Sequence, residues 1–201
     1  MKLQVALDFT NMKDALRVCR KVYKYVDIIE LGTPLIKAEG LGIVKKFKKF
    51  RKPIVADLKT MDTGFLEAEM AFKAGADIST VSGTADLATI EGVLKAARKY
   101  KKKIYVDTIG VKDIKRILKL KPHYLEVHTS IDSQNKGKSV IDSLRKLKGL
   151  KTKLAVAGGI GLKNISAVKE YNPGVVVVGG AITKAKNPRE VARKLSEVVK
   201  K

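Results

Sequence analysis

Residues 53–64 read PIVADLKTMDTG, an apolar run that ends in a cluster of charges. The apolar residues 54–56 are typical of a buried strand. Side chains alternate along a strand, so Asp57 and Lys59 are expected on the same face at its carboxyl end, with Asp62 on the turn beyond. Charges that follow a buried strand need partners. The stretch therefore predicts either a solvated loop with an ion pair or the rim of a functional site.

The same strand-and-helix pattern repeats along the whole chain. Short apolar segments typical of strands alternate with amphipathic segments typical of helices. The strands are expected at residues 3–8, 26–32, 54–59, 77–82, 104–109, 124–128, 154–157 and 175–178. The helices are expected at 13–24, 34–50 with an interruption near Gly40 and Gly42, 64–74, 85–101, 112–120, 139–148, 162–171 and 188–199.

Eight strand–helix pairs without a long insertion predict a single α/β domain over residues 1–201. Apolar strands separated by amphipathic helices pair in parallel through right-handed crossovers. A count of eight favours closure into a (β/α)8 TIM barrel. A doubly wound open sheet is the alternative. We find no linker, no low-complexity tract and no second domain.

The composition predicts a cytoplasmic protein with an aliphatic core. Hydrophobic residues make up 45% of the 201 residues and aromatic residues only 5%. No apolar run approaches a membrane span, and the segment MKLQVALD is typical of a strand rather than of a signal peptide, so no membrane association is expected. The single cysteine, Cys19, excludes an intrachain disulfide and is expected to be a small buried hydrophobe.

The charge balance is strongly basic, with 42 Lys and Arg against 20 Asp and Glu, a formal net charge of +22. Such a charge fits nucleic-acid binding, an anionic substrate or a lysine-rich surface. The lysines recur in nearly every predicted helix, and the chain carries neither zinc-finger spacing nor an RNA-recognition signature. We expect no specific nucleic-acid partner, and a basic nucleic-acid-binding module is the alternative of another class.

Polar residues gather where the predicted strands end. In a barrel, the carboxyl ends of the strands form one mouth, and active sites lie there. A single acidic residue could be a helix cap, and a single histidine could be a satisfied buried imidazole. Independent accidents would not select the same end of five strands, so an active site is expected at Asp8, Glu30, Asp57, Lys59, Asp107 and His128.

The chemistry of these side chains suggests their roles. Glu30 and Asp57 offer hard oxygen ligands without a Cys or His cluster, which suits Mg²⁺, or Mn²⁺, better than zinc. Lys59 lies between Asp57 and Asp62 and should stay protonated, and His128 is the natural general acid and base. A proton removed beside a carbonyl leaves an enediolate, which a divalent cation and an ammonium would stabilise.

Glycine pairs follow the last two strands. Gly158 and Gly159 come after the predicted strand 154–157. Gly179, Gly180 and Ala181 come after the predicted strand 175–178. These positions bring backbone N–H groups to the place where barrels hold phosphate. The two pairs together predict a phosphate monoester as the substrate's other end, with tight-turn packing as the alternative.

Eight sequence words spread over the chain resemble those of a known family. They are VALDF (5–9), YVDIIELGTPLIKAEG (25–40), VADLKTMDTG (55–64), AGAD (74–77), VDTIGV (106–111), VHTSID (127–132), AVAGGI (155–160) and VVGGAIT (177–183). The chain resembles the 3-hexulose-6-phosphate synthases of the orotidine-5'-phosphate decarboxylase suprafamily. The Asp-x-Lys-x-x-Asp signature specifies only the suprafamily, and the neighbouring words select the branch.

The resemblance implies a Mg²⁺-dependent aldolase that joins formaldehyde to D-ribulose 5-phosphate through an enediolate and gives D-arabino-3-hexulose 6-phosphate. Members of the suprafamily are dimers with sites at the subunit interface. By resemblance, the roles are a substrate hydroxyl at Asp8, the metal at Glu30 and Asp57, the enediolate region at Lys59 and Asp107, the proton at His128, and Asp62 contributed by the partner subunit.

Two branches of the suprafamily fit less well. Orotidine decarboxylases carry a lysine where this chain has Glu30, and they need no metal. The 3-keto-L-gulonate-6-phosphate decarboxylases share the metal-binding Glu and Asp but carry an arginine in place of Ile131. An enzyme like these decarboxylases is the nearest alternative. Ser82 stands where the family usually has leucine, a change expected to matter little.

Overall fold

Eight parallel strands pair in sequence order, and the last pairs with the first to close a barrel. The computed structural model describes residues 1–147 and 149–200. The strands are β1 (Lys2–Leu7), β2 (Ile28–Leu31), β3 (Ile54–Thr60), β4 (Ile78–Ser82), β5 (Lys103–Asp107), β6 (Tyr124–His128), β7 (Leu154–Ala157) and β8 (Val175–Val178). The predicted TIM barrel is confirmed, and the open sheet is wrong.

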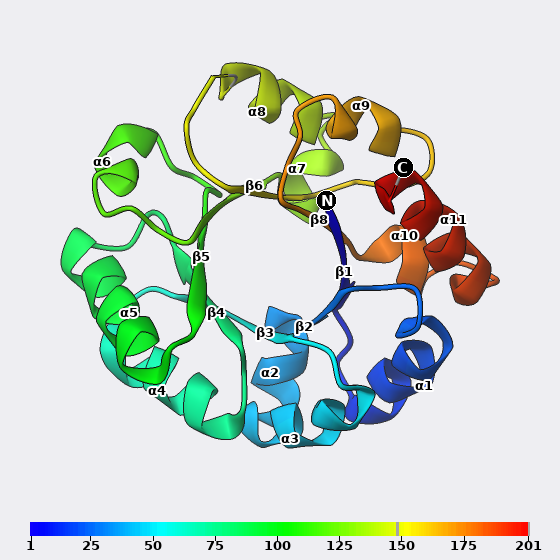
Figure 1. Cartoon of the computed structure of the whole chain (residues 1–201), viewed down its shortest axis with the longest axis horizontal. Helices are drawn as coiled ribbons and strands as arrows, with labels where there is room; N and C mark the ends of the chain where they lie inside the picture. Colours follow the sequence, from blue (N-terminus) through cyan, green and yellow to red (C-terminus); the bar gives the residue numbers. More distant parts are fainter. Residues whose placement is uncertain (148, 201) are drawn as a thin grey trace.

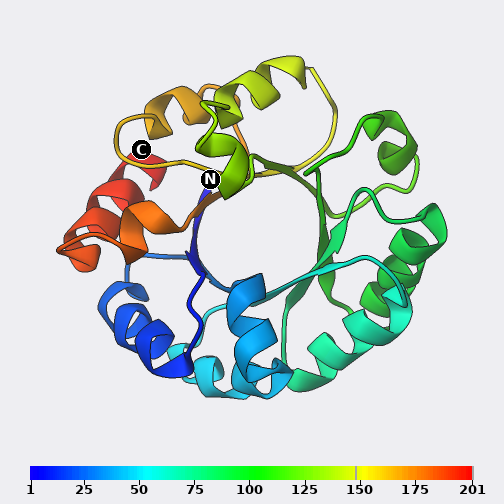
Figure 2. The same cartoon turned by 180° about the vertical axis from the view of Figure 1, so that it is seen from behind.

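Helices surround this ring of strands (Figure 1). They are α1 (Met12–Val22), α2 (Thr33–Glu39), α3 (Val44–Phe47), α4 (Gly64–Ala74), α5 (Leu87–Tyr100), α6 (Ile114–Leu118), α7 (Ile131–Gln134), α8 (Val140–Lys146), α9 (Ile165–Lys169), α10 (Gly180–Thr183) and α11 (Pro188–Lys200). Two 3₁₀ turns, η1 (Leu41–Ile43) and η2 (Lys48–Phe50), flank α3. The short helix α7 lies closer to the barrel axis than α8 and α9 in both views (Figures 1 and 2).

Several boundaries differ from the predicted ones. The predicted strand 26–32 is only four residues long, because residues 26, 27 and 32 lie outside β2. The predicted helix 34–50 is broken into pieces, with Gly40 in the left-handed region at φ 72°. The loop after β6 and the Gly-Gly turn after β8 each contain a short helix that was not predicted. The predicted helix 139–148 ends at Lys146, and residue 148 lies outside the described residues.

Alternation along the strands separates two apolar layers. Side chains that face outward pack against the helices, and those that face inward form a small core inside the barrel. This inner core consists of Ala6, Ile28, Val55, Ile78, Tyr105, Ala155, Ala157, Val175 and Val177. The ring of Tyr105 packs 5.1 Å from that of Tyr124, centroid to centroid. The inner core closes the barrel below the mouth.

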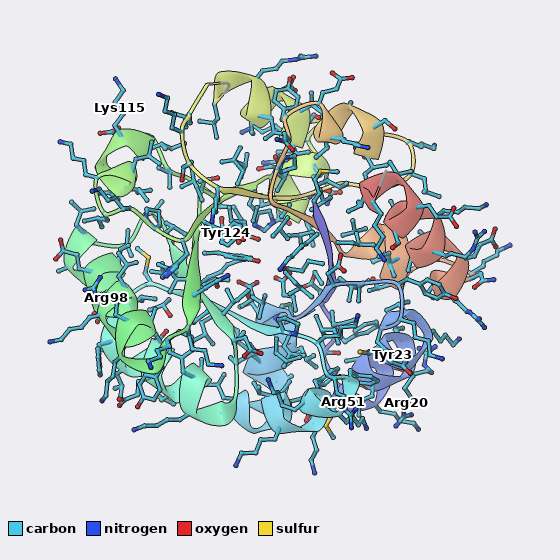
Figure 3. All side chains as sticks on the ribbon, in the orientation of Figure 1. Arg20, Tyr23, Arg51, Arg98, Lys115 and Tyr124 are labelled. Atoms are coloured by element: carbon cyan, nitrogen blue, oxygen red, sulfur yellow. The ribbon has the colours of Figure 1, made fainter. Side chains whose placement is uncertain are left out.

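The surface is basic on many sides. Arg20, Arg98 and Lys115 are exposed and lie at different places around the periphery (Figure 3). This distribution is that of a lysine-rich and arginine-rich surface, and the absence of a specific nucleic-acid partner stays a prediction. Cys19 is buried as expected, and burial raises the pKa of its thiol to about 12. Among the described residues, no helix is both long and apolar enough to cross a membrane.

Candidate active site

The carboxyl ends of the strands bring the predicted side chains to one mouth. Alternation places Glu30 on the same side as Ile28 of the inner core, and Asp57 on the same side as Val55. Asp107 and His128 end β5 and β6 in the same way, two residues beyond Tyr105 and Glu126. Four strands thus direct titratable side chains to the same end of the barrel, as the sequence predicts.

Lys59 reaches this group through an irregularity in β3. The register between β3 and β4 shifts between Ala56 and Thr60, and Lys59 has a left-handed φ of 47°. Its N–H donates to Oγ1 of Thr80 at 2.8 Å, which holds the irregular backbone in place. A left-handed conformation is uncommon for a residue with a Cβ, and such bulges often re-aim a side chain beside an active site.

The ammonium of Lys59 lies between two carboxylates. Its Nζ is 2.9 Å from Oδ2 of Asp57 and 2.9 Å from Oδ2 of Asp107. Burial acts to lower the pKa of Lys59, but the negative charges of Asp57 and Asp107 outweigh it and raise the pKa well above its usual range. The arrangement agrees with the prediction that Lys59 stays protonated.

Asp57 is held by hydroxyls as well as by Lys59. Oγ1 of Thr80 donates to its Oδ1 at 2.7 Å, and Oγ1 of Thr33 donates to its Oδ2 at 2.7 Å. Both threonines come from neighbouring elements, β4 and the start of α2. The carboxylate orientation is therefore fixed before any ligand binds.

Asp107 joins Lys59 to His128. Nδ1 of His128 lies 2.9 Å from Oδ2 of Asp107, and Oδ1 accepts the N–H of Ile109 at 2.8 Å. Burial acts to raise the pKa of Asp107, but the hydrogen bond from His128 and the charge of Lys59 lower it to about 2. An ionised Asp107 requires a proton on Nδ1 of His128, which leaves Nε2 to exchange protons with a substrate.

Glu30 is buried to about the same degree as Asp57, the other predicted metal ligand. Its side chain is 5% exposed, and Oε2 accepts a hydrogen bond of 2.7 Å from Nε2 of Gln4. Tyr105 donates in turn to Oε1 of Gln4 at 3.2 Å. Burial, followed by repulsion from Asp57 and then Asp8, raises the pKa of Glu30 well above its usual range. A partner cation is what such a buried, repelled carboxyl group lacks.

Asp8 is open to solvent and rests against bare backbone. A Cβ added to Gly32 would lie 2.0 Å from Oδ1 of Asp8, and one on Gly179 would lie 3.4 Å from its Oδ2. Enclosure by the walls of the mouth and then the charge of Asp57 raise the pKa of Asp8. Gly32 is a site residue that the sequence analysis missed, although it directly follows β2.

Glu126 is a second missed residue. It faces the barrel interior two residues before His128 and is 2% exposed. Its Oε2 is buried and has no hydrogen-bond partner among the described residues. Burial, then repulsion from Asp107 and Glu30, raises its pKa well above the usual range. Its place in the alternation, on the same face as His128, was a signal that could have identified it.

The two predicted phosphate turns lie side by side. Gly158 has a left-handed φ of 109°, and a Cβ there would lie 2.3 Å from the carbonyl oxygen of Thr129, so only glycine fits. A Cβ on Gly161 would lie 3.2 Å from that of Ala181. The first N–H bonded within the second turn is that of Ile182, which donates to Gly179. The N–H groups of Gly180 and Ala181 precede it and have no partner among the described residues.

Lys184 supplies a cation beside this turn. A Cβ on Gly180 would lie 3.8 Å from Cδ of Lys184. The positive charge of Lys184 acts to lower the pKa of Asp8. The sequence analysis did not select Lys184, because one lysine among so many carries no distinguishing signal. Gly158, Gly159, Gly179, Gly180 and Ala181 lie as predicted after β7 and β8, and a phosphate held there stays a prediction.

Asp62 stands apart from the other predicted site residues. It is exposed, and its Oδ1 accepts the N–H of the adjacent Thr63 at 2.6 Å. Within the described part of the chain, no hydrogen bond joins it to Lys59 or Asp57. A catalytic role for Asp62 therefore stays a prediction.

A family model described as Orotidine 5'-phosphate decarboxylase / HUMPS family matches residues 1–195. The chain belongs to this family. Among curated members, the 3-hexulose-6-phosphate synthase of Mycobacterium gastri is 43% identical over 206 residues, covering 99% of this chain and 100% of that protein. The similarity to this family extends over the full length of the chain and does not depend on the Asp-x-Lys-x-x-Asp signature alone.

Two solved structures of the HUMPS family separate its branches. The 3-hexulose-6-phosphate synthase from Salmonella typhimurium has a TM-score of 0.95 at 40% identity, over 99% of this chain and 98% of that one. The 3-keto-L-gulonate-6-phosphate decarboxylase from Vibrio cholerae has a TM-score of 0.87 at 33% identity, over 99% and 97%. The predicted membership of the synthase branch, an aldehyde-lyase, is confirmed.

The residues of this HUMPS family member fit the implied divalent metal. Glu30 and Asp57 are oxygen donors that face one interior, and repulsion between them is the charge-related reason for the raised pKa of Glu30. Mg²⁺ prefers such hard oxygen ligands. Lys59 already contacts Asp57, so a cation would share Asp57 with that ammonium. The fit supports the predicted ligands, and the identity of the ion stays a prediction.

Proposed function

We propose that this protein is a Mg²⁺-dependent aldolase acting as a homodimer in the cytoplasm. It would join formaldehyde to D-ribulose 5-phosphate to give D-arabino-3-hexulose 6-phosphate, and run the reverse reaction. The single observation that carries this function is the chain of contacts Lys59–Asp107–His128 at the mouth. Full-length similarity to 3-hexulose-6-phosphate synthases supports the choice of reaction.

The binding step uses both sides of the mouth. The phosphate would rest on the turns after β7 and β8, where the N–H groups of Gly180 and Ala181 and the ammonium of Lys184 offer positive charge. Asp8, supported by Gly32, lies between these turns and Glu30, where it can accept a hydrogen bond from a sugar hydroxyl. The reacting carbons then face Lys59 and His128.

The chemical step needs a base and a stabilised oxyanion. His128 would take the proton from the carbon next to the carbonyl through Nε2, while Asp107 holds Nδ1 and stabilises the imidazolium. The resulting enediolate carbon attacks the carbon of formaldehyde, and the formaldehyde oxygen takes the proton back from the imidazolium of His128. Lys59 remains protonated and offsets the developing negative charge. A Mg²⁺ held by Glu30 and Asp57, or Mn²⁺ in its place, supplies further electrophilic stabilisation when bound.

The function is tested by release of formaldehyde. Purified protein is incubated with D-arabino-3-hexulose 6-phosphate and Mg²⁺, and formaldehyde is measured. We expect release by the wild type, loss in Asp57→Ala, and unchanged release in the exposed control Asp142→Ala on α8. Absence of release by the folded wild type, or full activity of Asp57→Ala, would remove the proposal.

The dimer proposal rests on the surface around Asp62. Met61, Leu66 and Met70 are 57%, 55% and 51% exposed, an unusual group of large apolar side chains on and before α4. A cavity of about 330 Å³ connects Met70 with Asp57. A second copy seated on this apolar face would bring its own Asp62 toward the mouth.

Complementation between two inactive variants tests the shared site. Lys59→Ala and Asp62→Ala are each expected to lose activity. In a re-equilibrated mixture, half of the dimers are mixed and each contains one intact site, so about a quarter of the wild-type activity should return. No recovery, together with a monomer in sedimentation, would overturn the shared site without touching the reaction assignment.

A further inference from the structure

Three side chains at the mouth are arranged as ligands of one ion, and they are not the predicted Mg²⁺ pair. Asp107, Glu126 and His128 each offer one ligand atom, and these atoms lie within 4.8 Å of one another. Asp107 and Glu126 are neighbours across β5 and β6, in register with each other. Both are 2% exposed, so the group is built into the barrel wall and is not a surface cluster.

Glu126 is the member that lacks a partner. Asp107 accepts from Lys59, His128 and a backbone N–H, but Oε2 of Glu126 is buried without any partner in the described chain. A buried carboxyl oxygen with no partner costs stability, so it is normally satisfied by a hydrogen bond or a cation. Its ligand atom belongs to the same three-residue cluster.

The charges around Glu126 also favour a cation. The carboxylates of Asp107, Glu30 and Asp57 repel that of Glu126, whereas Lys59 attracts it. Lys59 is hydrogen-bonded to Asp57 and forms an ion pair with Asp107, and no bond from it to Glu126 is present among the described residues. The ammonium of Lys59 therefore contacts Asp57 and Asp107 and leaves Glu126 without a direct cationic partner among the described residues.

The donor set distinguishes the ion. An imidazole nitrogen with two carboxylates suits zinc and similar ions, with ligand distances of about 2.0–2.2 Å, whereas Mg²⁺ prefers oxygen alone. We propose that Asp107, Glu126 and His128 form a second cation site, selective for Zn²⁺-type ions, whose occupation withdraws His128 from proton transfer. Such an ion competes with Lys59 for Asp107, so the site acts as an inhibitory site.

Zinc binding can be followed without any activity, because the chain contains only two histidines. NMR of the imidazole protons is recorded during a Zn²⁺ titration in excess Mg²⁺, with the other histidine, His123, as internal reference. We expect the signals of His128 to change at about one equivalent and those of His123 to stay. In Glu126→Gln the same change should need at least about tenfold more Zn²⁺, whereas the exposed control Glu91→Gln should titrate like the wild type.

The proposal is overturned if the NMR signals of His128 change equally in Glu126→Gln, if only the signals of His123 change, or if no signal changes at one equivalent of Zn²⁺. If Glu126→Gln does not fold, calorimetry of the wild type against His128→Asn decides, since the Zn²⁺ binding heat must disappear in the variant. Inhibition is scored as the Zn²⁺ concentration that halves each protein's own activity. The claim of inhibition rests on the proposed function. If the protein binds zinc but has no aldolase activity, the proposed function is overturned and the proposed zinc site stands.

Discussion

Nζ of Lys59 lies 2.9 Å from Oδ2 of Asp107, the same oxygen that Nδ1 of His128 approaches at 2.9 Å. One carboxylate oxygen therefore positions both the cation that stabilises negative charge and the base that moves the proton. Motion of one group must alter the other through Asp107. These contacts pair Asp57 and Lys59, two of the three charges that follow the buried strand.

Replacement of Lys59 by methionine should abolish most of the activity. The variant keeps the volume of the side chain but removes the ammonium between Asp57 and Asp107. Loss of one preorganised group that stabilises an oxyanion lowers kcat by roughly 10²–10³-fold. Formaldehyde release under saturating substrate measures the effect. Lys73→Met, at an exposed lysine on α4, is the control, and a Lys59→Met enzyme within about threefold of wild type would contradict the assignment.

Asp107 should make the protein sensitive to acid. Its folded pKa is about 2, below the ordinary value of 3.8, so its stabilising effect is present above the unfolded pKa and is lost as the pH falls from about 4 to 2. The effect is on the order of 2 kcal/mol. Urea unfolding at pH 6 and pH 3 should show the gap between wild type and Asp107→Asn narrowing at the lower pH. A constant gap would contradict the ionised state of Asp107.

Glu126 should have the opposite pH dependence. Its raised pKa means that the folded protein keeps the proton to higher pH than the unfolded chain does, so stability is full below the ordinary pKa of 4.5 and falls as the pH rises through the folded pKa. Glu126→Gln removes this loss. Unfolding free energies measured from pH 5 to pH 8 should rise in the variant relative to wild type, and parallel curves would refute the expectation.

Gly32→Ala should disturb the site more than the fold. The new Cβ would lie 2.0 Å from Oδ1 of Asp8, so that short side chain must move, whereas the Gly32 backbone itself is unstrained at φ −65°. We expect activity to fall about as far as in Asp8→Ala, with less than about 1 kcal/mol lost in stability. Gly42→Ala, where nothing lies within 4 Å, is the matched control. Wild-type activity in Gly32→Ala would show that Asp8 is dispensable.

The parts of the fold that were predicted correctly depend on local signals. Strands β6, β7 and β8 and helix α4 begin and end at the predicted residues. In each, an apolar or amphipathic pattern stops at a glycine or a polar residue, and both kinds of signal act within a few residues. The mouth residues followed from the same signals, because parallel strands that end in polar residues must present them together.

The parts that were missed depend on contacts between distant segments. The left-handed Lys59 is held by a bond to Thr80, 21 residues away, which no local pattern reveals. The orphaned oxygen of Glu126 is apparent only when the neighbouring strands are in place. The helices α7 and α10 are too short for an amphipathic pattern, since each is four residues long.

Because β8 pairs with β1, the barrel closes late during synthesis of the protein. Val175 lies opposite Lys2, so the ring stays open until β8 has left the ribosome. Until then the acidic side chains of the early strands have no enclosed interior in which to be buried. A nascent chain therefore cannot form its complete mouth by stages, because the last strand must be in place before the ring is closed.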